Sequence, residues 1–380
     1  MRTFVNPAVR RDSAYTGLFT ADDYRDVDTF YAERPTLRPS PLRVLPGLAA
    51  RLGISSVLIK DESQRFGLEA FKTVGVTYAM HRLGRERIAR GVVCATAGNH
   101  GRAVARAARD ADVPCTVFVP APGALASATE LDVRSARVQA MRIDGADVID
   151  VKGTYEDAVA RAASRAEETG AVMLSDTAST ETDTIARWIM LGYTRLLSES
   201  SKAWPAPPHV VFVQGGVGGL VAAAASWFAF HYGSERPALL ACEPDSAACL
   251  QESARAGEAV DLSDPVRRAS SDLDASDGGR ASFATIMAGL RCATPSAAAW
   301  PAVRDGIDAF LSIPDSAAFD AIARLARPVA GDPVIVAGPS GACGVGALLT
   351  LPRHPESSGL GALGRLDRST SVMAIVTEGA

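Results

Sequence analysis

The sequence has few of the residues that mark disulfide-bonded, redox or metal proteins. It contains six cysteines and five histidines in 380 residues. No two cysteines form a C-x-x-C pair, so we interpret them as small buried apolar residues. The histidines do not fall at metal-ligand spacing, so we predict no metal site. The sequence leaves open whether Cys249 and Cys292 meet.

Long apolar runs and an excess of one charge are also lacking. The longest apolar stretch, 220–230, includes Ser226 and is too short to span a bilayer. The first residues contain no apolar core of signal-peptide length, so we expect a cytoplasmic protein without membrane partners. The net charge is -4 and the charges are mixed along the chain, which argues against nucleic-acid binding.

The chain instead repeats a short apolar run, a glycine- or proline-rich turn and an alanine-rich amphipathic run. This alternation of strands and helices predicts an α/β fold with parallel sheets covered on both faces, and ligands bind at the carboxyl ends of such strands. Strands are expected at 57–60, 91–95, 115–119, 147–151, 172–174, 209–214, 239–242 and 334–337. Helices are expected at 101–109, 126–142, 155–168 and 220–233, and 253–280 and 357–369 are weakly patterned.

Lys72 lies in the segment RFGLEAFKTVG among apolar neighbours that include Ala70, Phe71 and Val74. An apolar setting disfavours the charged form of an amine, which is what a Schiff-base lysine requires. A lysine that snorkels from a helix start is the alternative. Asp176, in LSDTAST, is a candidate general acid or base, with a turn aspartate as the alternative.

Two turns follow predicted strands and suit anionic groups. In Thr96-Ala97-Gly98-Asn99-His100-Gly101, backbone N–H groups at a helix start could bind a carboxylate, and Asn99 adds an amide donor. In Gln214-Gly215-Gly216-Val217-Gly218-Gly219, four glycines in five residues could cradle a phosphate. The G-G-x-G-G spacing favours a lone phosphate over a dinucleotide. An ordinary strand-to-helix turn remains the alternative for both segments.

A further turn, Gly338-Pro339-Ser340-Gly341-Ala342, is expected to follow the strand at 334–337. At such a position the Ser340 hydroxyl could contact a heteroaromatic nitrogen. A serine that caps a helix is the alternative.

The ordered motifs S-Q-R-F-G-L-x-A-F-K, A-G-N-H-G, Q-G-G-V-G-G and P-S-G-A resemble those of the tryptophan-synthase-like (fold type II) pyridoxal-phosphate enzymes. Segments 61–73, 176–178, 187–193 and 284–290 and the start FVNP are most similar to diaminopropionate ammonia-lyases. The resemblance runs over nearly the whole chain. It implies two three-layer α/β domains, 1–75 with 190–380 (large, discontinuous) and 76–189 (small), with the cofactor in the cleft between them.

The resemblance also implies residue roles around pyridoxal 5'-phosphate. Lys72, beside Phe71, would form the Schiff base, and Asn99 would face the ring hydroxyl. Gly215, Gly216, Val217, Gly218 and Gly219 would bind the phosphate, and Ser340 would face the pyridine nitrogen. A serine there, rather than a carboxylate, would leave the nitrogen largely unprotonated and suit β-elimination. The substrate would contact Thr96, Ala97, Gly98, His100 and Arg291.

Two positions depart from the family pattern. The family turn reads T-D-G-N-H-G, and Ala97 stands where the family has a catalytic aspartate. The family segment G-L-A-C-G-E-P becomes Gly289-Leu290-Arg291-Cys292-Ala293-Thr294-Pro295. Asp176 is then the remaining carboxylate candidate beside Lys72.

Three functions follow from these features. The first is a homodimeric diaminopropionate-type ammonia-lyase, in which Lys72, or Asp176 in one stereochemical case, removes the Cα proton and Asp176 assists the leaving group. Pyruvate and ammonia would be released from a small amino acid. The second is a serine/threonine dehydratase-like or other β-leaving-group lyase, or a β-replacement synthase, which Ala97 and Arg291 favour. The third is a non-catalytic regulatory protein on the same fold.

Overall fold

The structure is a computed structural model that describes residues 1–12, 14–96, 98–121, 128–264, 266, 283–351, 360, 363 and 366–379. The chain forms two compact units. Unit 1 comprises Met1–Ala70, Thr177–Asp183 and Tyr193–Ala380, and unit 2 comprises Phe71–Asp176 and Thr184–Gly192. Lys72 belongs to unit 2, whereas the sequence-based division placed it with residues 1–75.

Unit 1 is built on a seven-stranded sheet whose five inner strands are parallel. The strands lie in the order β1 (Arg2–Val5), β10 (Ala309–Ile313), β9 (Ala238–Pro244), β8 (Val210–Gln214), β11 (Ser371–Val376), β3 (Ser56–Asp61) and β2 (Leu42–Val44). The edge strands β1 and β2 run antiparallel to their neighbours. All five residues of β8, VVFVQ, are buried, as expected for an inner strand covered on both faces.

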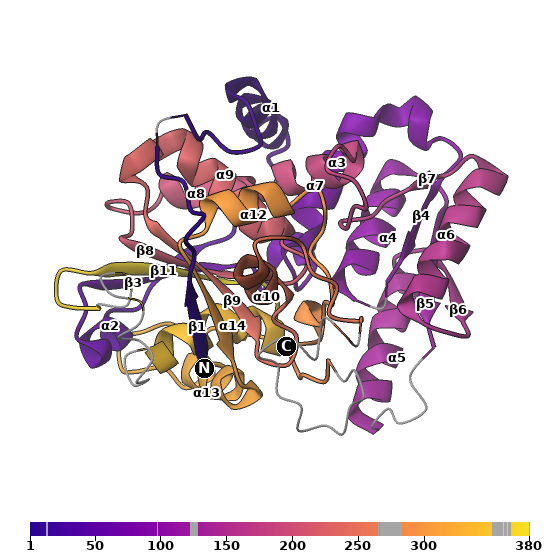
Figure 1. Ribbon diagram of the computed structural model, residues 1–380. Helices are drawn as coiled ribbons and strands as arrows, with labels where there is room; N and C mark the ends of the chain where they lie inside the picture. Colours follow the sequence, from indigo (N-terminus) through magenta and orange to yellow (C-terminus); the bar gives the residue numbers. More distant parts are fainter. Residues whose placement is uncertain are drawn as a thin grey trace. The chain divides into compact units, whose positions relative to one another are not determined.

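Helices cover both faces of this sheet (Figure 1). The helices α9 (Gly219–Tyr232) and α12 (Trp300–Gly306) lie over one face, and α13 (Asp315–Ala326) and α14 (Pro339–Thr350) over the other. The first eleven residues of α9, GLVAAAASWFA, are all buried, which explains why they carry no polar stripe. The remaining described helices of unit 1 are α1 (Ala21–Ala32), α2 (Pro46–Leu52), α8 (Arg195–Ser201) and α10 (Cys249–Ala256), with 3-10 turns η1 (Arg65–Gly67), η2 (Gly233–Glu235) and η4 (Ala288–Leu290).

Unit 2 has a four-stranded parallel sheet in the order β6 (Asp147–Val151), β5 (Cys115–Pro120), β4 (Val92–Ala95) and β7 (Val172–Met173). The helices α3 (Lys72–Ile88), α4 (Asn99–Ala111) and α5 (Ala128–Ile143) lie on one face, and α6 (Tyr155–Thr169) lies on the other (Figure 1). α7 (Thr184–Tyr193) ends at the boundary with unit 1. Val92, Cys94 and Val117 from the strands join the apolar faces of α3 and α4 in one core.

The fold class and most predicted elements are confirmed, but the predicted strand at 334–337 is wrong. This segment has the alternation of a strand, since Val334 is 61% exposed and Ile335 1%. It pairs with no strand among the described residues. The Ile335 N–H instead donates to the carbonyl of Leu325, near the end of α13. Alternating burial therefore shows that one side of the segment faces the core, but it does not show that the segment pairs with a neighbouring strand.

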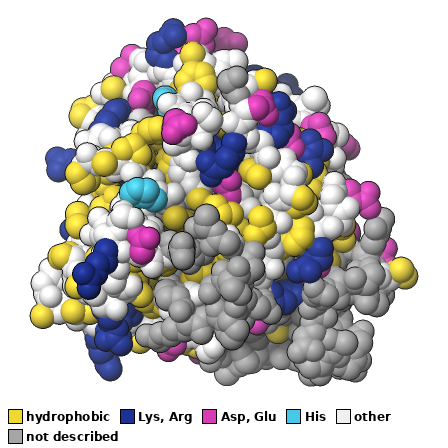
Figure 2. All heavy atoms as spheres, turned by 60° about the vertical axis from the view of Figure 1, so that its left-hand side comes forward, with side chains coloured by type: hydrophobic (Ala, Val, Ile, Leu, Met, Phe, Trp, Pro, Cys, Tyr) yellow, Lys and Arg dark blue, Asp and Glu magenta, His cyan; other side chains and the backbone are white. Residues whose placement is uncertain are grey.

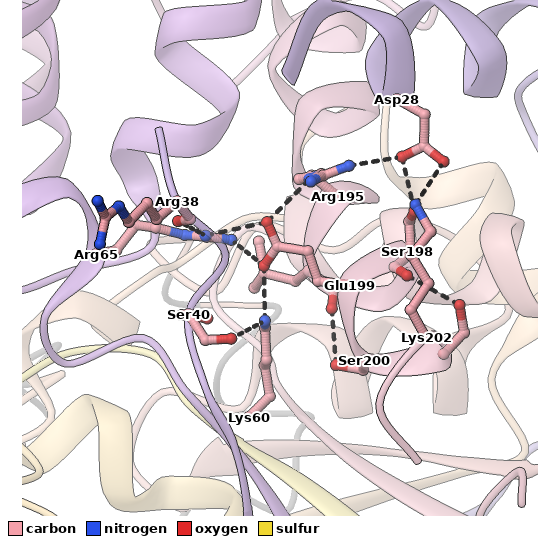
Figure 3. Close-up of polar contacts among 12 residues, drawn as sticks. Asp28, Arg38, Ser40, Lys60, Arg65, Arg195, Ser198, Glu199, Ser200 and Lys202 are labelled. Atoms are coloured by element: carbon pink, nitrogen blue, oxygen red, sulfur yellow. Dashed lines mark hydrogen bonds and ion pairs between the residues drawn. The ribbon is translucent and has the colours of Figure 1, made fainter. Parts of the chain in front are cut away.

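A network of buried ion pairs surrounds Arg65, near the end of the Met1–Ala70 segment of unit 1 (Figure 3). The Arg65 guanidinium donates to Glu62 Oε2 at 2.8 Å and to both oxygens of Glu199 at 3.1 and 2.8 Å. Lys60 Nζ lies 2.7 Å from Glu199 Oε2, and Arg195 Nε lies 2.9 Å from Glu199 Oε1. Glu199 from α8 thus meets three cations, and Arg195 extends the network to Asp28 on α1.

The surface carries both signs of charge. Figure 2 shows basic and acidic side chains interspersed with apolar ones over the described part of one face. Within the described residues, no helix has both the length and the apolar character needed to cross a membrane. The same residues contain no group of three or more His, Cys, Asp or Glu side chains arranged to hold a metal ion.

Candidate active site

Lys72 and Asp176 meet in unit 2. Lys72 is the first residue of α3, and Asp176 follows β7 in a bend of the chain. The Lys72 Nζ atom lies 2.5 Å from Asp176 Oδ2, and the two side chains are 22% and 17% exposed. The Lys72 amine therefore does not extend freely into solvent but ends on a carboxylate in a largely buried position.

The charges around Asp176 determine its ionisation. Burial alone would raise the pKa of the Asp176 carboxyl, but the nearby Lys72 ammonium and His100 outweigh burial and hold that pKa well below its usual range. Asp176 is therefore a carboxylate at neutral pH while the Lys72 ammonium contacts it. A carboxylate paired with an amine at this distance can accept a proton from it and return it.

His100 and Phe71 complete this cluster. His100, in the first turn of α4, is 6% exposed, and its Nε2 lies 3.0 Å from the carbonyl oxygen of Leu174. Its Nδ1 lies 3.8 Å from Asp176 Oδ2. The Phe71 ring packs beside the lysine, with its centroid 5.2 Å from Nζ. The sequence predicted His100 as a substrate contact, and that role stays a prediction.

The turn before α4 is organised by its own side chains. The Gly98 N–H donates to Thr96 Oγ at 3.0 Å, and Asn99 is the first residue of the helix. The N-cap of α4 is Gly98, which has no side chain to cap the helix, so the positive end of the helix dipole can attract an anion. A Cβ on Gly101 would lie 2.8 Å from both Thr96 and Met141, which excludes larger residues there. Ala97 lies outside the described residues, so its predicted role is untested.

The glycine-rich turn lies in unit 1 between β8 and α9, as predicted. Gly218 has φ of +97°, a conformation that favours glycine, and α9 begins at Gly219. The N–H groups of residues 216–219 have no hydrogen-bond partner within the described part of the chain. Four free donors at the N-terminus of a long helix fit a phosphate.

Side chains close behind the turn explain why glycine is needed. A Cβ on Gly215 would lie 2.8 Å from Glu243 Cγ, and a Cβ on Gly216 would lie 3.3 Å from Cys292 Sγ. Cys249 donates from Sγ to the Gly216 carbonyl. Cys249 and Cys292 both lie near Gly216 but form no disulfide with each other.

Ser340 lies in the first turn of α14, whose N-cap is Gly338. Its Oγ accepts the N–H of Gly289, and its own N–H donates to Glu378 Oε1, both at 3.0 Å. Ser340 is therefore not the N-cap residue of α14, and no strand precedes it directly. Because its Oγ only accepts in the contact with Gly289, its hydroxyl proton is available to an acceptor. Arg291 is exposed and donates from its guanidinium to the Thr285 carbonyl of the same loop.

Sequence reasoning missed two buried acids next to these segments. Glu243, at the end of β9, backs the glycine turn and accepts the N–H groups of Leu250 and Gln251, both at 2.8 Å. Glu378 holds the Ser340 turn through its side chain and, through its carbonyl, the Gly338 N–H. In the sequence, only the position of each acid at the end of an apolar run could have indicated a buried role. The sequence does not show which groups each acid would contact.

Comparison with known proteins connects these features. The sequence profile of the pyridoxal-phosphate dependent enzymes matches residues 34–361. The chain belongs to this family. It is a fold type II enzyme, and the predicted cofactor, pyridoxal phosphate, is confirmed together with the ammonia-lyase type of the enzyme.

Individual relatives and structures are consistent with this membership. The chain is 32% identical to the diaminopropionate ammonia-lyase of Salmonella typhimurium, over 93% of this chain and 88% of that protein. It is 31% identical to that of Escherichia coli, over 95% and 89%. A crystal structure of the Escherichia coli enzyme with an aminoacrylate-PLP azomethine intermediate superposes with a TM-score of 0.83 at 29% identity, covering 100% of this chain and 93% of that one.

The residues present fit the cofactor of this family. The free N–H groups of 216–219 suit its phosphate, Lys72 would supply the amine, and Ser340 has a hydroxyl proton to donate. Lys72, Asp176 and His100 meet within unit 2, and the glycine turn and Ser340 lie in unit 1. The expectation that both sets bind one cofactor in a cleft stays a prediction.

Proposed function

We propose that this enzyme eliminates a β-substituent from a small amino acid of the diaminopropionate type, with release of a 2-oxo acid and ammonia. The observation that carries the proposal is the 2.5 Å pair of Lys72 Nζ and Asp176 Oδ2. Such a pair supplies one group that can take the Cα proton and a second that can protonate the departing β-amine. The likeness to diaminopropionate ammonia-lyases supports the choice of substrate class.

Pyridoxal phosphate, when bound, withdraws electrons from the Cα atom of an attached amino acid. Residues of the chain would bind the cofactor, orient the substrate and move the protons. Lys72 would hold the cofactor and move the Cα proton, and Asp176 would hold the proton that the leaving group needs. The N–H groups of 216–219 would bind the phosphate, and the α4 N-terminus with Thr96 and Asn99 would orient the substrate carboxylate.

A substrate panel tests the proposal. Enzyme loaded with pyridoxal phosphate is given both enantiomers of 2,3-diaminopropionate, L-serine, D-serine and L-threonine, and 2-oxo acid and ammonia are measured. We expect turnover of at least one diaminopropionate enantiomer above the hydroxyl substrates. Preference for serine or threonine would favour the dehydratase-like alternative, and no product from any substrate would argue for β-replacement or for a non-catalytic protein.

The lysine assignment has its own test. Lys72→Ala should lose the visible absorbance of the bound cofactor and lower turnover by on the order of 10³-fold or more, because both attachment and proton transfer depend on the amine. Lys60→Ala is no suitable control, because Lys60 is part of the buried ion network. Exposed Lys202 is a matched control, and Lys202→Ala should keep both signals. Normal turnover in Lys72→Ala would overturn the assignment.

A further inference from the structure

His100 presents an unusual combination of contacts in unit 2. Its Nε2 lies 3.0 Å from the Leu174 carbonyl oxygen, which can only accept, so Nε2 carries a proton. Its Nδ1 is buried and has no hydrogen-bond partner among the described residues. It faces Asp176, whose Oδ2 lies 3.8 Å away.

The protonation state of Nδ1 decides whether this arrangement is favourable. In a neutral imidazole with its proton on Nε2, Nδ1 offers a lone pair, and two acceptors face each other in a buried position. A proton on Nδ1 replaces that repulsion with attraction between an imidazolium and a carboxylate. The separation is about 1 Å longer than a charge-assisted hydrogen bond, and Asp176 is held at 2.5 Å by Lys72 on its other side.

The groups around Asp176 leave no other candidate for a replacement cation within the described part of unit 2. Lys72 faces it from α3 and His100 from α4. Cys94, buried in β4, is coupled to Asp176, but burial raises the pKa of its thiol so far that it stays neutral. When the Lys72 nitrogen is engaged elsewhere, as the proposed function requires, the carboxylate loses its ammonium partner.

We infer that His100 is a positioning residue that becomes the ion-pair partner of Asp176 when the Lys72 nitrogen leaves it. The imidazole then takes up one proton at Nδ1 and donates that N–H to Oδ2. Asp176 then rests as an oriented carboxylate, although burial alone would favour its protonation, until it accepts the proton that it passes to the leaving group. This inference rests on the proposed function for its role in turnover but not for the pairing itself.

The pairing is tested without activity, by NMR of the imidazole carbons and nitrogens in protein with labelled histidine. There are five histidines, and the signals missing from His100→Gln identify this one. In the cofactor-free protein, Lys72→Met should increase the fraction of His100 that carries a proton on both ring nitrogens at neutral pH relative to the wild type. The double variant Lys72→Met with Asp176→Asn should abolish that increase. An increase that persists in the double variant would refute the pairing.

The role in turnover is tested on the loaded enzyme by the pH profile of kcat. His100→Gln can keep the donor to Leu174 but cannot titrate, so we expect kcat to fall about tenfold and its inflection at the imidazole titration to disappear, with little change in KM. His209→Gln is the matched control, because His209 is exposed and contacts Ser371 in unit 1. A purely structural role predicts an equal loss at every pH, and that result would refute positioning.

The two tests fail in different ways. If the enzyme eliminates nothing from any amino acid, the proposed function is wrong while the NMR series still decides the pairing. If elimination occurs and the His100→Gln profile keeps the wild-type shape, the proposed function stands and the inference about His100 is wrong.

Discussion

Lys72 and Asp176 show what single residues contribute when burial and pairing act together. Neither residue stands out from its sequence neighbours alone, since lysines at helix starts and aspartates in turns are common. Their 2.5 Å contact makes them the proton-transfer pair of the proposed function. The same applies to Glu243, an acid at the end of an apolar strand that proves to be fully buried behind the glycine turn.

Glu243 gives a pH prediction. Burial raises the pKa of its carboxyl from the usual 4.5 to about 8, although two backbone N–H donors oppose this. The folded chain therefore binds a proton that the unfolded chain releases between these values. This stabilisation is fully present below pH 4.5 and is lost as the pH rises through 8, on the order of 5 kcal/mol in total.

Thermal unfolding of the wild type and Glu243→Gln at pH 5.5 and 8.0 checks this. The wild type should lose stability between the two pH values, and Glu243→Gln should lose much less. Exposed Glu235 supplies the control variant, Glu235→Gln, which should behave as the wild type does. An equal pH dependence in all three proteins would contradict the assignment to Glu243.

At the scale of elements, one carboxylate joins several segments of unit 1. Glu199 on α8 contacts Lys60 on β3, Arg65 in η1 and Arg195 on its own helix (Figure 3). Paired with three cations, the Glu199 carboxylate has a pKa below its usual value even though burial alone would raise it. Removing one member leaves uncompensated buried charge, which is costly even where the intact network adds little net stability.

Glu199→Gln should therefore lower the free energy of unfolding by about 3–5 kcal/mol at pH 7. Asp28→Asn is the matched control, because Asp28 is 40% exposed at the solvent end of the same network and should cost about 1 kcal/mol or less. Urea unfolding measures both. The Glu199 contribution is present above pH 4.5 and is lost as the pH falls through its lowered pKa, so the two variants should converge in acid. Equal losses at pH 7 would contradict this account.

At the scale of the whole molecule, the sequence predicts that residues of both units bind one cofactor. Hydrogen exchange with and without pyridoxal phosphate tests that expectation, because a ligand protects the backbone it contacts. Loading should slow exchange in 215–219 of unit 1 and in 98–101 of unit 2. Slower exchange in only one of the two segments would contradict a shared site. The exposed helix α6 serves as an internal reference and should not change.

The sequence predicted those features that depend on local pattern. Apolar periodicity and turn residues predict the strands of unit 2, the helices α4, α5 and α6 and the glycine turn after β8, and the structure confirms them. The elements that were not predicted are the helices α1 to α3, α7, α8, α10 and α12 to α14 and the strands β1, β2, β10 and β11. The segment 334–337 has a strand pattern but no strand partner within the described residues, because a ladder needs a neighbour that periodicity does not supply.

The sequence by itself determined the fold class and the cofactor and predicted the lysine that would bind it, because these depend on short motifs whose residues lie side by side. Tertiary structure alone decided which charges meet. Lys72 and Asp176 lie 104 residues apart, and Arg65 and Glu199 lie 134 apart. Such partners are brought together by packed strands and helices, and the ionisation of a buried group depends on those distances rather than on its neighbours along the chain.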